Sequence, residues 1–204
     1  MSGTHAVVVL AAGGSRRLGR PKQLLTRAGE TLVHRTVRLA SETSPRRLWV
    51  VTGAYRDEIQ TALAGMDCEF LFNEDWATGL ASSLQTAAAV LTAHTGPVLI
   101  AGCDQPALES VHLSRLLSGA EAAGCAATSH GGMPGIPAVV PAAIMRVANE
   151  LSGDRGFGER LRRLPPEALM TMRADELALD IDDQEDLRIA VQRGLIDDPA
   201  QAGS

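Results

Sequence analysis

One stretch near the start of the chain restricts its fold most, because it joins an apolar strand directly to a glycine-rich, basic loop. Residues Ala6 to Ala11 are an unbroken apolar and β-branched run, which predicts a strand buried on both faces of a parallel sheet. The loop that follows contains Gly13, Gly14 and Gly19, whose backbones can adopt positive φ and approach a ligand closely. The stretch therefore predicts the first strand and ligand loop of an α/β protein.

The same loop concentrates positive charge. Arg16, Arg17, Arg20 and Lys22 lie within seven residues, and no acidic residue precedes Glu30, although the whole chain has a formal net charge of −5. Lys22 is also the single lysine among 19 basic residues. A compact ammonium fits a phosphate where a planar guanidinium does not, although a lone lysine could fall at this position by chance. We expect the loop to bind a phosphate chain.

Two common phosphate-binding motifs do not fit this loop. Gly14 to Gly19 has the G-x-x-x-x-G spacing of a P-loop, but Arg20-Pro21 replaces the Lys-Ser/Thr that should follow. The dinucleotide fingerprint G-x-G-x-x-G cannot be placed on the glycines of the loop either. These mismatches disfavour a P-loop NTPase and an NAD or FAD enzyme.

Length and periodicity favour one α/β domain over residues 1–204, with residues 194–204 expected to form a flexible tail. Apolar periodicity alternates between the strand and helix types, with short connections between the segments. This pattern predicts a doubly wound, mostly parallel sheet flanked by helices. The expected elements after the loop are a helix over Thr31–Ala40, a strand over Arg47–Thr52, a helix over Tyr55–Leu63, a strand over Cys68–Phe72 and a helix over Leu80–Leu91.

Composition excludes several other classes of protein. The three cysteines (Cys68, Cys103 and Cys125) are odd in number and lack C-x-x-C spacing, which favours buried free thiols over disulfides or a zinc site. The net negative charge and the few aromatic residues indicate no basic or base-stacking surface that would bind a polynucleotide. No long apolar segment or charged leader indicates a membrane span or a secretory signal, so we expect a cytoplasmic protein.

Ligands of doubly wound sheets bind at the carboxyl ends of the strands, so the residues that follow each strand are candidates for a site. After the strand ending at Phe72, Gly79 and small hydroxyl residues open a helix whose free N–H groups could hold an anion. Simple capping of that helix by Thr78 or Ser82 is the alternative.

Asp104 follows the apolar strand that begins at Pro97, and a carboxylate at the end of a buried strand is costly unless a cation or donors satisfy it. Mg²⁺ bridged to phosphates is the common solution. The alternative is that Asp104 caps the helix that begins near Ser110.

The later segments are less regular. Residues 126–140 are rich in Gly and Pro until a strand expected near Ile136–Val140, and we expect this region to form the wall of a second substrate site. His130 could contact a phosphate there, or be a solvated loop residue. An alternating run over Leu177–Ile181 predicts a short strand, which leads into Asp182 and further acids that favour a helix N-terminus.

Taken together, these motifs resemble a known family. Leu10-Ala-Ala-Gly-Gly-Ser-Arg-Arg-Leu-Gly-Arg-Pro-Lys22 is similar to the L-A-A-G-x-S-x-R-M-G-x-x-K signature of the MobA/MocA-like nucleotidyltransferases, and Gly-Cys-Asp104-Gln-Pro resembles the G-x-D-x-P magnesium motif of that family. The resemblance is strongest to the molybdenum cofactor cytidylyltransferase branch. It implies that Lys22, Arg17 and Asp104 are catalytic and that Mg²⁺, or Mn²⁺, is the cofactor.

The resemblance also implies a nucleotide site and a metal site. Asn73 to Leu84 resembles the N-x-x-W-x-x-G-[ML]-x-x-S-[LI] segment of the family, and Leu177 to Arg188 resembles its D-x-D-T-P-E-D-L element, although Asp183-Gln184 replaces Thr-Pro. Asp182 thus takes the place of a second metal ligand beside Asp104. The implied nucleotide-binding residues are Leu10, Ala12, Gly13, Gly14, Ser15, Asn73, Gly79 and Ser83.

The implied reaction is CMP transfer from CTP to the phosphate of a molybdopterin-type acceptor, with release of pyrophosphate. Leu10-Ala-Ala-Gly13 is typical of the members that use CTP rather than GTP. Gly158 stands where the family has an arginine, for which Arg155 or Arg160 could substitute. The alternatives are a nucleotidyltransferase for another phosphorylated acceptor, such as a sugar or an isoprenoid precursor, and a pterin cofactor carrier or chaperone. The implied protein partner is a xanthine-dehydrogenase-family enzyme or its chaperone.

Overall fold

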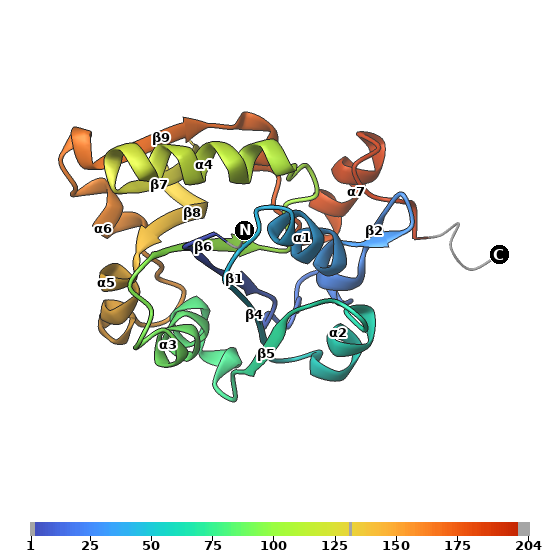
Figure 1. The fold of residues 1–204 in the computed structure, drawn as a ribbon. Helices are drawn as coiled ribbons and strands as arrows, with labels where there is room; N and C mark the ends of the chain where they lie inside the picture. Colours follow the sequence, from blue (N-terminus) through green and yellow to red (C-terminus); the bar gives the residue numbers. More distant parts are fainter. Residues whose placement is uncertain (1–2, 131, 200–204) are drawn as a thin grey trace.

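Strand β1 (Ala6–Leu10) lies between two parallel neighbours, β4 (Arg47–Thr52) and β6 (Pro97–Gly102). In the computed structural model, which describes residues 3–130 and 132–199, these strands belong to one seven-stranded sheet in the order β5-β4-β1-β6-β8-β7-β9 (Figure 1). Only β8 runs antiparallel to its neighbours in this described sheet. The remaining strands are β5 (Glu69–Phe72), β7 (Cys125–His130), β8 (Met133–Pro141) and β9 (Leu169–Arg173).

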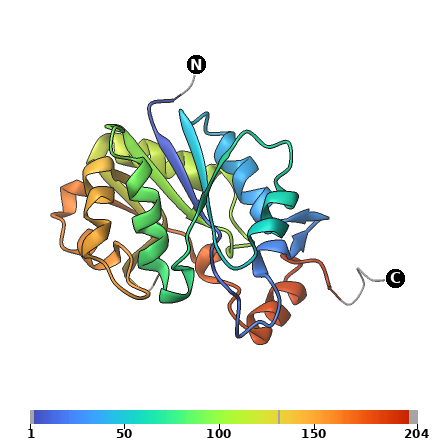
Figure 2. The ribbon, with the colours of Figure 1, turned by 90° about the horizontal axis from the view of Figure 1, so that it is seen from below.

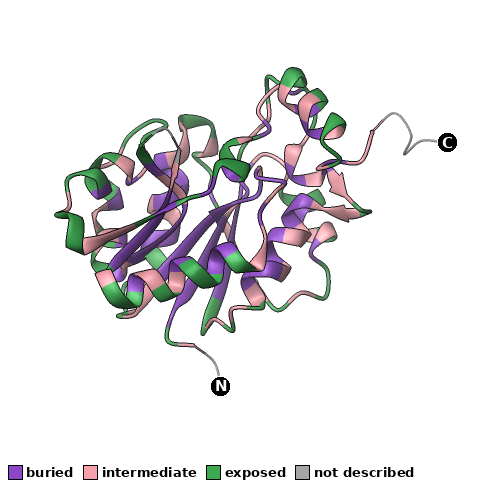
Figure 3. Cartoon of the chain, turned by 90° about the horizontal axis from the view of Figure 1, so that it is seen from above, coloured by how far each residue is buried: buried purple, intermediate pink, exposed green. Residues whose placement is uncertain are grey.

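Helices cover both faces of the sheet, as the sequence predicts. Successive residues of β1 alternate between two cores: Val7 and Val9 pack beneath one helical layer, and Ala6 and Val8 beneath the other. Figure 3 shows the strands as buried and the outward faces of the helices as exposed. One layer contains α1 (Leu32–Ser41), α2 (Arg56–Ala62) and α4 (Ser110–Ala123); the other contains α3 (Leu80–Val90), α5 (Ala142–Met145) and α6 (Gly158–Arg162).

The order of the strands reverses beside β1, and this reversal determines where a crevice can form. The chain runs from β1 outward through β4 and β5, and then returns to the other side of β1 as β6. In open α/β sheets the loops at such a reversal diverge and leave a crevice at the carboxyl ends of the strands. The loop after Leu10 and the segment after Gly102 therefore meet at one end of the sheet.

A third, smaller core attaches the end of the described chain to the loop after β1. Leu187 of α7 (Gln184–Gln192) packs with Leu18 of the loop and with Ile181, and the Gln184 side chain donates to the carbonyl oxygen of Leu18. Figure 2 shows α7, in red, beside the blue loop. Helix α7 thus holds the loop and the segment around Asp182 together.

The structure differs from the flexible tail expected over residues 194–204. Ile196 is buried, and the Asp197 carboxylate accepts hydrogen bonds from the backbone N–H groups of Ala28 and Gly29, each at 2.8 Å. Those two residues form the turn between β2 (Thr26–Arg27) and β3 (Glu30–Thr31). The chain is therefore packed as far as Asp197, while residues 200–204 lie outside the described part.

The strand predicted over Leu177–Ile181 is wrong. A 3-10 turn occupies Asp175–Ala178 and the following residues are irregular. The alternating pattern was misleading because Leu177 and Ile181 are buried in two different cores instead of on one face of a strand. The sheet ends instead with β9 (Leu169–Arg173), which pairs with β7 and was not predicted.

The expected strand near Ile136–Val140 lies within the longer β8, which forms a hairpin with β7. The side chain of His130 and the whole of Gly131 lie outside the described residues, so the structure does not test the role considered for His130. Within residues 3–130 and 132–199, no helix has the length and apolar character needed to cross a bilayer.

Candidate active site

The glycine loop after β1 passes directly over an aromatic ring. A Cβ at Gly14 would lie 2.6 Å from Cζ3 of Trp76, so a side chain there would force the loop away from the ring. The Gly14 carbonyl oxygen accepts a hydrogen bond from the Tyr55 hydroxyl at 3.1 Å, and the Arg16 guanidinium lies 5.7 Å from the centre of the Trp76 ring. Trp76 is thus a platform for the loop.

Gln23 holds the loop from the other side. Its side chain is 1% exposed, and Nε2 donates to the carbonyl oxygens of Ala11 at 3.0 Å and Gly13 at 2.7 Å. Ser15, which has a positive φ of 46°, accepts a hydrogen bond from the Lys22 backbone N–H at 3.1 Å. Gln23 was not predicted as a site residue, because an amide next to Lys22 has no distinctive spacing.

Lys22 lies between two carboxylates at the crevice beside β1. Its Nζ is 2.8 Å from Oδ2 of Asp104 and 2.8 Å from Oδ1 of Asp182. Arg17 Nη2 binds the second oxygen of Asp182, also at 2.8 Å, although the Arg17 side chain is exposed. The structure therefore brings together the four charged residues singled out from three distant segments of the sequence.

This cluster is strongly coupled electrostatically. Burial lowers the pKa of Lys22, but its ion pairs and hydrogen bonds with Asp104 and Asp182 outweigh burial and raise the pKa overall. Burial raises the pKa of Asp182, but its hydrogen bond to Lys22 and the charges of Lys22 and Arg17 outweigh that effect and lower it. At neutral pH the site therefore contains an ammonium and the Asp182 carboxylate, both charged.

A third acid, Asp180, lies beside the cluster and was not assigned a role from the sequence. Desolvation by the surrounding residues is the largest effect that raises the pKa of Asp180 above its usual range, and the negative charge of Asp104 adds to it, although the residue is exposed. Its position two residues before Asp182, in the D-x-D spacing, was the available signal. The cluster therefore has an excess of acids over cations.

The structure contradicts the alternative that Asp104 caps a helix. The N-cap of α4 is Glu109, whose backbone N–H donates to Nδ1 of His112 in a reciprocal capping box. Asp104 instead faces Lys22 and has a quarter of its side chain exposed. Asp183 is the acid that caps a helix, since it accepts from the backbone N–H groups of Glu185 and Asp186 at the start of α7.

The segment before α3 is fixed by internal hydrogen bonds. Asn73 is buried, and its Nδ2 donates to the hydroxyls of Ser82 at 2.8 Å and Ser83 at 3.0 Å. Gly79 has a φ of +114°, and a Cβ there would lie 2.5 Å from the Gly153 carbonyl oxygen. That oxygen accepts from the backbone N–H of Ala81. Asn73, Ser83 and Gly79 therefore stabilise the segment before α3. Their binding of a nucleotide remains a prediction.

Capping of α3 by a hydroxyl side chain, the alternative considered for this segment, is also wrong. The N-cap is Gly79, and the hydroxyls of Thr78 and Ser82 donate to backbone carbonyl oxygens instead. The two arginines considered as substitutes for the missing family arginine lie on the exposed loop and on α6. Arg155 is exposed, and Arg160 is paired with Glu150 at 3.4 Å.

The donors present fit a small divalent cation. Two carboxylates, from Asp104 and Asp182, already share one ammonium, so their oxygens converge on one position. Within residues 3–130 and 132–199, no three or more His, Cys, Asp or Glu side chains group as a complete metal cage. Mg²⁺ does not require such a cage, because it usually retains waters and binds one or two carboxylates together with substrate phosphates.

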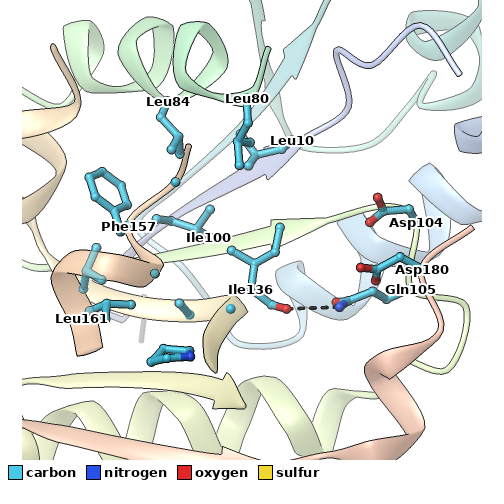
Figure 4. A pocket seen from close by; sticks show the side chains of 16 residues that line it. Leu10, Leu80, Leu84, Ile100, Asp104, Gln105, Ile136, Phe157, Leu161 and Asp180 are labelled. Carbon is cyan, nitrogen blue, oxygen red and sulfur yellow. Dashed lines mark hydrogen bonds between the residues drawn. The ribbon is translucent and has the colours of Figure 1, made fainter. Parts of the chain in front are cut away.

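A cavity of about 380 Å³ adjoins the charged cluster (Figure 4). Asp104, Gln105 and Asp180 lie at one end, and the other end is lined by apolar side chains of α3, β6, β8 and α6. Leu10, the last residue of β1, also lines it. The charged cluster and an apolar cavity therefore lie side by side.

A comparison with protein families identifies the family of this chain. Residues 7–169 match the MobA-like NTP transferase domain. The chain belongs to the MobA-like NTP transferase family. This match covers β1, the loop and Asp104, and it ends before Asp180 and Asp182. The resemblance seen in the sequence is thus confirmed for the family, a family of nucleotidyltransferases.

Solved structures agree with this assignment. A Mycobacterium sp. strain JC1 homologue of Mycobacterium tuberculosis Rv0371c is 28% identical, with a TM-score of 0.80 over 96% of this chain and 98% of that chain. A nucleotidyl transferase from Methanothermobacter (Mth528) is 26% identical, with a TM-score of 0.77 over 94% and 97% of the two chains.

Among curated proteins, the bifunctional protein GlmU of Bifidobacterium longum subsp. infantis is 36% identical over 129 residues, which are 60% of this chain. The match covers 28% of the length of that protein.

Proposed function

We propose that this protein transfers CMP from CTP to the phosphate of a molybdopterin-type acceptor and releases pyrophosphate. The observation that carries the proposal is the position of the Lys22 ammonium, 2.8 Å from both Asp104 and Asp182 at the crevice beside β1. Membership of the MobA-like NTP transferase family supports nucleotidyl transfer. The choice of CTP rests on the Leu10-Ala-Ala-Gly13 sequence.

Mg²⁺ is the cofactor we propose, with Mn²⁺ as a substitute, held by Asp104 and Asp182. Rv0371c of Mycobacterium tuberculosis, 22% identical with a TM-score of 0.74, has a structure described as a complex with manganese. When bound, such an ion neutralises the triphosphate and the leaving pyrophosphate.

The residues of the chain perform the remaining work by charge and position. An ionised phosphate oxygen of the acceptor attacks the α-phosphorus of CTP, and the bond from that phosphorus to the bridging oxygen of the β-phosphate breaks. Lys22 and Arg17 stabilise the charge that accumulates on the departing pyrophosphate. The nucleophile is already ionised, so the reaction needs no general base.

The decisive assay measures pyrophosphate release with CTP and Mo-molybdopterin. We expect release that depends on both substrates and is at least tenfold slower when GTP replaces CTP. Binding of the pterin without release would identify a carrier or chaperone instead, and faster release with GTP would contradict the choice of CTP.

Lys22→Arg tests the role of the ammonium within the same assay. The variant keeps the charge but replaces a point donor with a planar fork, so we expect at least a tenfold loss of activity. Arg188→Lys, an exchange on the exposed face of α7, is the matched control and should retain full activity. Equal turnover in Lys22→Arg and the unmodified protein would remove Lys22 from the site.

A further inference from the structure

The glycine loop after β1 runs beside the turn that follows β4. A Cβ at Gly53, the first residue after β4, would lie 2.6 Å from the Ala12 carbonyl oxygen, so the two backbones are in direct contact. The backbone N–H of Ala54 donates to that oxygen at 3.2 Å. The ring of Tyr55 packs against the core on the α1 and α2 side of the sheet, and its hydroxyl donates to the Gly14 carbonyl oxygen at 3.1 Å. The turn after β4 therefore holds two carbonyl groups of the loop.

Gln23 holds the carbonyl groups that alternate with these two. Its Nε2 donates to the carbonyl oxygens of Ala11 at 3.0 Å and Gly13 at 2.7 Å. All four successive carbonyl groups of residues 11–14 thus accept a hydrogen bond, in turn from Gln23 and from the turn after β4. The N–H groups are different: within residues 3–130 and 132–199, the backbone N–H groups of residues 12–15 have no hydrogen-bond acceptor.

The bound carbonyl groups fix the directions of these N–H groups. The peptide bonds of the loop are trans, and a trans peptide group points its N–H opposite to its C=O. The hydrogen bonds from Ala54 and Tyr55 therefore direct the N–H groups of Gly13 and Ser15 away from the turn after β4. Successive backbone N–H groups without an internal acceptor form a concavity that binds anions. Gly13 is exposed, so an anion in solution can reach the loop.

We propose that Tyr55 and Gln23 are positioning residues for the phosphate chain of the nucleotide. By holding the loop carbonyls, they keep the N–H groups of residues 12–15 directed outward as donors to phosphate oxygens. This inference rests on the proposed function, because it names how the triphosphate of that reaction is held, but it depends on neither the base nor the acceptor.

Tyr55→Phe tests the inference with inorganic tripolyphosphate, a probe that has a phosphate chain but no base. The variant loses the hydrogen bond to Gly14 and keeps the packed ring, so its melting temperature should stay within a few degrees. We expect calorimetry with Mg²⁺ present to show an affinity for tripolyphosphate that is at least threefold weaker. Gln23→Met removes two hydrogen bonds with a side chain of similar size, and it should weaken this affinity at least tenfold.

Thr61→Val is the matched control for the loss of a hydroxyl. The Thr61 hydroxyl also donates to a backbone carbonyl oxygen, that of Asp57, at 2.9 Å, but on the exposed face of α2. This variant should bind tripolyphosphate as tightly as the unmodified protein. The inference would be overturned if the unmodified protein did not bind tripolyphosphate, if Tyr55→Phe bound it equally well, or if Thr61→Val lost as much affinity as Tyr55→Phe.

Cytidine, which has no phosphate, distinguishes positioning of the phosphate chain from support of the whole site. We expect the affinity of Tyr55→Phe for cytidine to stay within twofold of that of the unmodified protein. A loss of the same size for cytidine and tripolyphosphate would make Tyr55 a structural residue and overturn the inference.

A parallel titration with CTP and Mg²⁺ separates this inference from the proposed function. If the unmodified protein binds tripolyphosphate but neither CTP nor cytidine, the proposed function fails, and the comparison of tripolyphosphate affinities still decides the inference. If CTP binds and tripolyphosphate affinity is the same in Tyr55→Phe and the unmodified protein, the inference fails and the proposed function stands.

Discussion

A partly buried ammonium between two carboxylates neutralises them, and it also occupies the position where their oxygens converge. Lys22 does both, because its side chain is 15% exposed and its Nζ binds Asp104 and Asp182 at 2.8 Å each. A triphosphate would give this ammonium alternative anionic partners and would release the two carboxylates. At the scale of single residues, we therefore expect metal binding and nucleotide binding to be coupled through Lys22.

Lys22→Met should separate the two kinds of binding. Without the ammonium, Asp104 and Asp182 face each other without a shared cation, so the affinity for Mn²⁺ alone should rise at least tenfold, while the affinity for CTP should fall. Electron paramagnetic resonance of free Mn²⁺ measures the first effect and calorimetry the second. Arg188→Met, which removes an exposed cation from α7, is the control, and an Mn²⁺ affinity that falls or stays equal in Lys22→Met would refute the coupling.

At the scale of secondary-structure elements, α7 is the part of the fold that aligns the loop with the acids. Its Leu187 packs on Leu18 from the glycine loop and on Ile181, which directly precedes Asp182. One small core thus sets the distance between the Arg17 guanidinium and the Asp182 carboxylate.

Leu187→Ala tests the role of α7. The truncation leaves a cavity, so we expect a loss of about 2 to 3 kcal/mol in the free energy of unfolding and at least a fivefold weaker affinity for Mg-CTP. Leu116→Ala in α4 is the control, because Leu116 is fully buried in a core that does not include the loop. If both variants lose stability and both keep full CTP affinity, α7 does not position the site.

Glu30 of β3, which lies just before α1, is an acid whose pKa affects stability at low pH. Hydrogen bonds from Arg38 lower the pKa of Glu30 to about 2 from its ordinary value of 4.5, against an opposing effect of burial and with a further contribution from His34. Because the folded pKa is the lower one, the stabilisation is complete above about pH 4.5 and is lost as the pH falls toward 2.

Glu30→Gln should accordingly cost on the order of 1 kcal/mol at pH 7, and the difference from the unmodified protein should shrink steadily between pH 4.5 and pH 2. Urea unfolding at a series of pH values measures this difference in the free energy of unfolding. Glu121→Gln, on the exposed face of α4, is the control. A difference that stays constant over this range would show that the ion pair does not stabilise the fold.

At the scale of the whole molecule, the sheet brings together segments that lie far apart in the sequence. Sequence motifs identify some of these segments as candidates for a site, but they do not show which segments contact each other. Lys22 and Asp104 were predictable, because each follows a buried strand and each lies in a distinctive motif, and parallel strands place their carboxyl ends at one edge of the sheet. Gln105 was not predictable as a link, since it bonds to the backbone of Leu177, 72 residues later.

Other features escaped prediction for related reasons. Asp180 lies at one end of a cavity whose apolar walls come from α3, β6, β8 and α6. The alternation over Leu177–Ile181 suggested a strand because one-dimensional periodicity does not show that two residues enter different cores. Local patterns therefore located the charged half of the site, whereas the apolar half depended on tertiary packing.

We propose that Lys22, Asp104 and Asp182 form one site for a metal-bound nucleoside triphosphate. Calorimetric titration of CTP into the unmodified protein and into Asp104→Asn, each with and without Mg²⁺, is the sharpest test of this site. We expect Mg²⁺ to strengthen CTP binding by the unmodified protein, and we expect this effect of Mg²⁺ to be at least tenfold smaller in Asp104→Asn, whose melting temperature should stay within a few degrees. An equal effect of Mg²⁺ on the variant would show that Asp104 does not hold the metal.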